Sequence, residues 1–147
     1  LSLGYARQKA LEVSSKQRDD WILAADTLVF VNSAPLGKPG TQTELLSMLN
    51  TLQDCREHSV WTGACLVNPL GELFFDAEEA RVVFDHIPLI ELERYAATDE
   101  WVDKAAGYAI QGWAKRYAKV VYGDIETVIG LSECAVYRLF EESGYPK

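Results

Sequence analysis

The chain has 147 residues and a mass of 16.4 kDa, a length that predicts a single domain. Hydrophobic residues make up 48% of it and aromatic residues 11%, which is enough for a packed core and argues against disorder. Its 22 acidic and 14 basic residues give a net charge of −8, which argues against duplex DNA as a partner. A small phosphorylated ligand stays open, because it needs only a few local cations or a metal ion.

Cysteine usage and hydropathy indicate the compartment. Cys55, Cys65 and Cys134 form no C-x-x-C pair and are accompanied by only two histidines, so a zinc site is not expected. Reduced thiols in a cytoplasmic protein are the simplest interpretation. No apolar run approaches the ~20 residues of a membrane span, and no signal peptide is visible. The chain opens without Met and directly in helical register, which suggests that the domain, residues 1–147, is truncated at its N-terminus.

The first half of the chain alternates between helix and strand patterns. Apolar spacing predicts a helix over residues 3–13, followed by a polar connection over 14–20. Residues 21–31 form an almost continuous apolar run, which predicts a strand buried on both faces. Residues 32–37, NSAPLG, have turn composition. Thr41 and Glu44 then have the spacing of a capping box, and four apolar residues at helical spacing follow them.

The second half favours an α/β fold. Residues 58–68 and 73–84 predict a hairpin around the turn NPLG, and Pro88 begins the next helix. Residues 117–122 and 127–129 are expected to be short strands, and a last helix is expected to begin at Ser132 or Glu133. Because strands alternate with helices, the sequence predicts a twisted mixed sheet with flanking helices.

Asp26 is the first candidate for chemistry, because it lies in the middle of the apolar run 21–31. An ionised carboxylate in such a strand is unfavourable unless it is paired, hydrogen-bonded or bound to metal. One interpretation is structural, with the side chain bonded to nearby backbone. The other is functional, as a metal ligand or a general base that activates water.

Lys38 follows the same run in the sequence GKP. The spacing of a P-loop is absent, and an isolated loop lysine is usually solvated. However, Gly37 permits close backbone approach and Pro39 stiffens the loop, so the ammonium group can meet a phosphate. Asp26 and Lys38 are therefore expected to face one pocket.

A third group comprises Asp103, Lys104 and Gln111. The acid and the lysine have a simple alternative interpretation as a surface ion pair. The amide of Gln111 offers both a donor and an acceptor, which suits recognition of a base edge. His58 is expected to pack at the start of a strand, and neither it nor His86 has a visible nucleophile partner, so a catalytic triad is not supported.

Five segments in order, AADTLVFVNSAPLGKP, a capped leucine helix, EHSVWTG, YAATDEWVDKAAGYAIQG and VIGLS, together resemble the Maf family of nucleoside triphosphate pyrophosphatases. The resemblance implies a twisted mixed sheet with a central cleft, similar to inosine triphosphate pyrophosphatases. It also implies hydrolysis of dTTP and UTP to monophosphate and pyrophosphate with a divalent ion, usually Mg²⁺. A homodimer is a further expectation from the family.

The resemblance assigns roles to particular residues. Asp26 would bind the metal or activate water, and Lys38 would contact phosphate. Lys9 would face the same cleft, while Thr27 and Gln111 would contact the substrate.

Family members also carry an N-terminal S-x-S-P-R-R segment, and this sequence has neither Ser-Pro nor Arg-Arg. Two hypotheses follow from this difference. The first is a pyrophosphatase, and the second is a catalytically impaired nucleotide-binding or regulatory domain linked to cell division.

Overall fold

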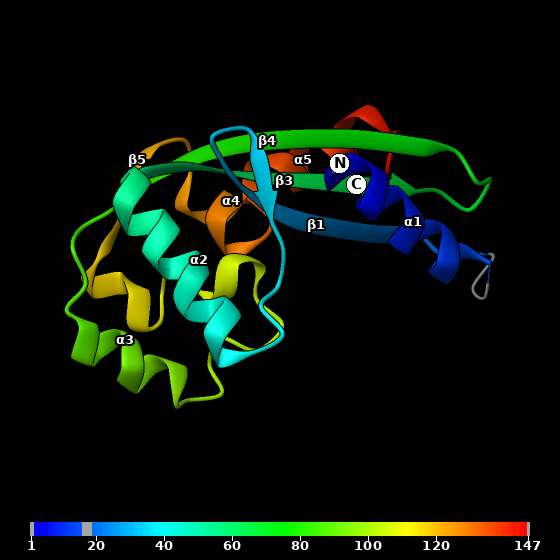
Figure 1. Cartoon of the computed structure of the whole chain (residues 1–147). Coiled ribbons are helices and arrows are strands. Elements are labelled where there is room, and N and C mark those ends of the chain that lie inside the picture. Colours follow the sequence, from blue (N-terminus) through cyan, green and yellow to red (C-terminus); the bar gives the residue numbers. More distant parts are fainter. Residues whose placement is uncertain (1, 16–18, 147) are drawn as a thin grey trace.

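The computed structural model describes residues 2–15 and 19–146, and residues 16–18 of the expected polar connection lie outside them. The described chain forms a five-stranded sheet with helices on both of its faces (Figure 1). Its elements are α1 (Ser2–Ser14), β1 (Ile22–Val31), β2 (Ala34–Leu36), α2 (Gln42–Cys55), β3 (Glu57–Val67), β4 (Leu73–Phe84), α3 (Leu89–Ala96), η1 (Ala105–Gly107), η2 (Trp113–Arg116), β5 (Ala118–Tyr122), α4 (Ile125–Ile129) and α5 (Glu133–Glu142). No helix in the described ranges is long and apolar enough to cross a membrane.

The strand order is β2-β1-β3-β4-β5. The predicted hairpin of β3 and β4 is confirmed, and its turn is held by Asn68, whose side chain accepts from the backbone of Leu70 and Glu72. The α/β class with flanking helices is confirmed as well. All pairs among the described strands are antiparallel, so the parallel pairs of the expected mixed sheet do not occur among them.

Alternate residues of β1 pack against different helices. Ile22 and Ala24 pack with Ala6 and Ala10 of α1, whereas Val29 and Val31 join the leucines of α2 in the main core. Because successive strand residues point to opposite faces, α1 covers one face of the sheet and α2 the other. Figure 1 shows α1 along one end of the sheet and α2 with α3 below the other end.

Two expectations for secondary structure were wrong. The segment 32–37 is not only a turn, because Ala34–Leu36 pair with β1 after a tight connection in which Asn32 and Ser33 have φ of 50° and 66°. Residues 127–129 belong to helix α4 rather than to a strand. Asp124 caps this helix by accepting from the backbone of Glu126, and this local cap outweighs the β-branched composition.

Strand β1 is also less buried than its apolar composition predicts. Its pairing with β2 covers only Val29–Val31, so residues 22–28 have a paired neighbour, β3, on one side only. Asp26 and Thr27 lie in this part of the strand and are partly exposed. The acid therefore sits at an open sheet edge and not in a strand buried on both faces.

Gly63 on β3 lets α1 lie directly on the sheet. It pairs in register with Asp26, and a Cβ atom at this position would come within 2.5 Å of the backbone nitrogen of Leu3. Since the colliding atoms belong to backbone, a side chain here requires the N-terminal turn of α1 to move away. The absence of a side chain at Gly63 thus sets the height of α1 above β1.

We expect Gly63→Ala to destabilise the fold by about 1–3 kcal/mol, because the methyl group displaces the start of α1. The measurement is the free energy of unfolding in urea. Gly4→Ala is the matched control, since a Cβ atom at this position of α1 would meet nothing within 4 Å and alanine improves helix propensity. Equal stability of the two variants would contradict the packing argument.

Candidate active site

One cavity collects the residues singled out in the sequence. Its volume is about 360 Å³, within the range that binds small ligands. It lies beside the open edge of β1 and reaches the loop after β2, the segment before η2 and the end of α4. The candidate residues on its wall are Lys9, Asp26, Thr27, Lys38, Asp103, Lys104 and Gln111. The expectation that Asp26 and Lys38 face one pocket is therefore confirmed.

Asp26 is bound by Lys9 from helix α1. The Lys9 ammonium donates to Oδ1 of Asp26 and, at 3.1 Å, to the carbonyl oxygen of Ala25. The Asp26 side chain is 19% exposed and that of Lys9 is 53% exposed, so both groups stay accessible from the cavity. The carboxylate of Asp26 thus faces both a cation and an open cleft, and its functional interpretation stays a prediction.

Lys38 is exposed on a loop, and the residues on either side of it are held in place by contacts. The backbone carbonyl of Gly37 accepts from Ala106 at 2.9 Å, and Pro39 is buried. A Cβ atom at Gly107 would come within 3.1 Å of Pro39, so the two loops approach closely because position 107 is glycine. The lysine side chain can thus move in solvent while its backbone is held against the opposite wall.

The opposite wall is the segment from Asp103 to Gln111, which contains η1. The hydroxyl of Tyr95, a buried residue of α3, donates to the carbonyl oxygen of Gly107 at 2.6 Å. Asp103 and Lys104 do not form the surface ion pair of the simpler interpretation within the described part of the chain. Gln111 is exposed at the end of this wall.

Comparison with known proteins identifies the family. The family model described as Maf-like protein matches residues 1–143. The chain belongs to the Maf family. It is 38% identical to a dTTP/UTP pyrophosphatase of Pyrococcus abyssi and 40% identical to one of Pyrococcus horikoshii, in each case over 99% of this chain and 77% of the relative. A dTTP/UTP pyrophosphatase of Halalkalibacterium halodurans is 39% identical over 95% of this chain and 73% of the relative.

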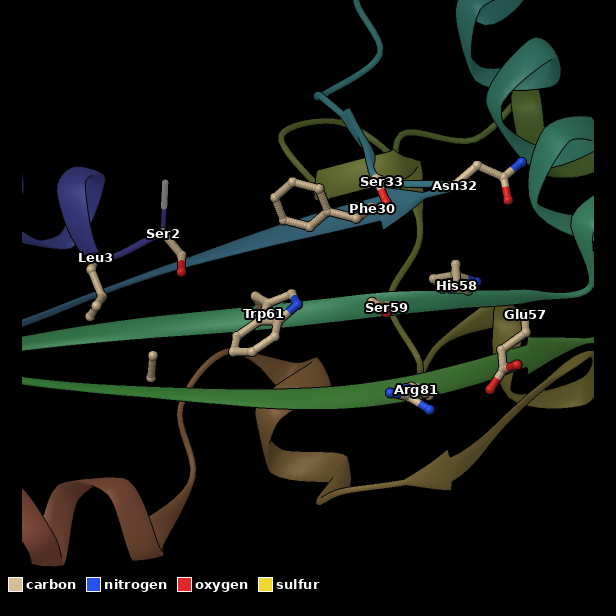
Figure 2. A pocket seen from close by; sticks show the side chains of 11 residues that line it. Ser2, Leu3, Phe30, Asn32, Ser33, Glu57, His58, Ser59, Trp61 and Arg81 are labelled. Carbon is tan, nitrogen blue, oxygen red and sulfur yellow. The ribbon is translucent and has the colours of Figure 1, made fainter.

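This Maf domain has a second and larger cavity, of about 670 Å³, on the face of the sheet that carries Trp61 (Figure 2). Phe30, Trp61 and Arg81 contribute side chains to it from three neighbouring strands. None of the candidate residues lines this cavity. Arg81 contacts Glu79 at 3.3 Å and lies over the ring of Tyr122, so its charge is partly engaged. The candidate active site is therefore the smaller cleft.

Sequence reasoning missed several residues of the cleft. Tyr108, Val128 and Gly130 line it, although the pattern around them is ambiguous or typical of a strand. Gly130 ends α4 with a φ of 145°, and this position was hidden because the sequence predicted a strand there. His58 packs at the start of β3 as expected, and its Nε2 atom lies 2.6 Å from the hydroxyl of Tyr108.

The pH dependence of stability tests the His58 contact. Burial lowers the pKa of His58 from 6.5 to about 4, so the unfolded chain binds more protons between these values. The contribution of His58 to the free energy of unfolding is therefore fully present above pH 6.5, and it is lost as the pH falls towards 4. We expect a slope of up to about 1.4 kcal/mol per pH unit in urea unfolding.

The matched variants for this measurement are His58→Gln and His86→Gln. His58→Gln should flatten the dependence between pH 6.5 and 4, and the exposed His86→Gln is the matched histidine control. Identical pH profiles for the wild type and His58→Gln would refute the assignment.

Proposed function

We propose that this chain hydrolyses dTTP and UTP to the nucleoside monophosphate and pyrophosphate. The observation that carries the proposal is the single cleft in which Asp26 lies among Lys9, Lys38 and Lys104. The curated relatives named dTTP/UTP pyrophosphatase support the same activity and substrates. Hydrolysis of a phosphoanhydride needs little covalent help from the protein, because positioned cations and an oriented water supply most of the rate.

The proposed roles follow from position. Asp26 has one carboxylate oxygen bound to Lys9, and its carboxylate orients the attacking water or the metal ion. Lys9 fixes that carboxylate and adds positive charge beside the phosphates. Lys38 is exposed and on a loop, so it reaches a distal phosphate as a point charge. Gln111 reads the base edge through its amide at the far wall.

Mg²⁺ is proposed as the cofactor. This ion prefers oxygen ligands and in nucleotide sites takes one or two carboxylates together with substrate phosphates. The described residues contain no group of three or more His, Cys, Asp or Glu that could hold a metal ion, so a fully protein-bound site does not fit them. Asp26 together with the triphosphate of the substrate does fit. When bound, the ion neutralises charge that develops on the phosphate oxygens.

Two further proposals concern the setting of the protein. A cytoplasmic location is supported by the free state of Cys55, Cys65 and Cys134, since a reducing compartment keeps thiols unpaired. A homodimer is proposed on the family resemblance only.

The first test is turnover. We expect phosphate release from dTTP and UTP in the presence of Mg²⁺ and an added inorganic pyrophosphatase, and a loss of at least about 100-fold in kcat for Asp26→Asn. Asp20→Asn, an exposed acid outside the cleft, is the control and should keep wild-type activity.

Phosphate release no greater from the wild type than from Asp26→Asn would refute the enzymatic proposal. A nucleotide-dependent rise in melting temperature without turnover would then favour the second candidate, a nucleotide-binding or regulatory domain. That candidate is kept because the described wall of the cleft supplies lysines but no arginine.

The second test concerns Lys38. We expect Lys38→Ala to weaken binding of a triphosphate by about tenfold and to leave binding of the monophosphate nearly unchanged, because its proposed partner is a distal phosphate. Titration calorimetry with dTTP in the absence of Mg²⁺ and with dTMP measures both. Lys119→Ala, an exposed lysine on β5 outside the cleft, is the control. Equal losses for the two nucleotides would contradict the role.

A further inference from the structure

A chain of hydrogen bonds runs beneath the cleft and joins β1, β3, α4 and β4. The hydroxyl of Thr27 lies 2.8 Å from that of Thr62, its register partner on β3. Thr62 donates to the backbone carbonyl of Thr127 at 2.6 Å. The Thr127 hydroxyl in turn donates to Glu78 at 2.9 Å. Thr62 and Thr127 are buried, with 4% and 1% exposure, and Thr27 lines the cleft.

The direction of these bonds is determined by counting protons. A carbonyl oxygen only accepts, so the single proton of the Thr62 hydroxyl is used on Thr127. Thr62 must therefore accept in its contact with Thr27, and Thr27 must donate. The proton of Thr27 is thus directed into the protein. Towards the cleft, the Thr27 oxygen therefore offers only its lone pairs, so it can accept a hydrogen bond but cannot donate one.

The far end of the chain of bonds is anchored by charge. Burial tends to raise the pKa of Glu78, but hydrogen bonds from Ser132, Arg138 and Thr127 outweigh it and hold the pKa below its ordinary value. Arg138 also binds both carboxylate oxygens of Asp76, at 3.0 and 2.9 Å. Glu78 therefore stays an acceptor for Thr127, which fixes α4 against the sheet. The end of α4 forms part of the cleft wall.

We propose that Thr62 is a positioning residue that holds the Thr27 hydroxyl as a hydrogen-bond acceptor for the bound nucleotide. The proposal rests on the proposed function, because the ligand is the pyrimidine nucleotide of that reaction. Phosphate oxygens at neutral pH only accept, so they are not partners for Thr27. The donating groups that dTTP and UTP share are the N3–H of the base and the 3′-hydroxyl of the sugar, and Thr27 recognises one of them.

The first experiment is a double-mutant cycle on binding. The ligand is the α,β-imido analogue of dTTP, which resists cleavage between these phosphates, and Kd is measured by calorimetry. We expect Thr27→Val and Thr62→Val each to raise Kd about five- to tenfold, and the double variant to match Thr27→Val alone. Thr62→Ser keeps the hydroxyl and should bind within about twofold of the wild type. Thr51→Val, on α2 outside the cleft, is the control.

Multiplication of the two single losses in the double variant would overturn the proposal, because Thr62 would then act independently of Thr27. Failure of Thr62→Ser to restore binding would overturn it as well. These outcomes differ from those expected of a purely structural role, in which the melting temperature changes but the two losses combine independently.

The second experiment uses no substitution at Thr62, so it can be carried out even if Thr62→Val fails to fold. The wild type and Thr27→Val are titrated with the imido nucleotide, its N3-methyl form and its 3′-deoxy form. We expect one modified nucleotide to bind the wild type more weakly than the unmodified one does. The affinity of that modified nucleotide should be the same for the wild type and for Thr27→Val. The N3-methyl form identifies the base and the 3′-deoxy form the sugar. Equal losses of all three nucleotides in Thr27→Val would refute the acceptor role.

The outcomes for the two proposals are separable. Tight binding of the imido nucleotide without turnover of dTTP would refute the pyrophosphatase activity. The double-mutant cycle would then still decide the role of Thr62. Turnover of dTTP with independent losses in the cycle would refute the role of Thr62 and leave the pyrophosphatase intact. If the wild type neither binds nor cleaves, both proposals fail.

Discussion

The ion pair between Lys9 and Asp26 is the contact on which the cleft depends, because it joins helix α1 to the open edge of β1. With the lysine about half exposed, such a pair contributes little to the stability of the fold. Its importance is geometric. Gly63 allows α1 to lie close to the sheet, and at that height the Lys9 side chain reaches the carboxylate. Packing between backbones thus places the charges.

Much of this arrangement was predictable from local patterns. The helix after Thr41 and the hairpin of β3 and β4 follow signals within a few residues, namely the capping box and the turn at Asn68. The exposure of β1 was not predictable, because it depends on how short β2 is and on where β2 stops pairing. Helix α4 was missed because its cap at Asp124 competes with a strand-like run of β-branched residues.

The candidate site likewise contains some residues that local sequence patterns reveal and others that only distant contacts reveal. Asp26, Lys38 and Gln111 could be found because each stands in an unusual local setting, and the structure brings them to one cavity. The role of Thr62 could not be found in this way. A threonine in an apolar strand is ordinary, and its meaning comes from two hydrogen bonds to residues 35 and 65 positions away. The sequence gives one indication of a polar environment near Thr62. Asp76 and Glu78 are two residues apart in β4, so both side chains lie on the same face of the sheet.

The net charge of the whole protein and the charges in the cleft both affect how a nucleoside triphosphate binds. With a net charge of −8, the protein repels a nucleoside triphosphate at long range, and screening by salt reduces that repulsion beyond about 8 Å. Within the cleft, Lys9, Lys38 and Lys104 face two acids, Asp26 and Asp103. This local excess of one positive charge is far below the charge of a triphosphate. The proposed divalent ion would supply the positive charge that a bound triphosphate still needs in this cleft.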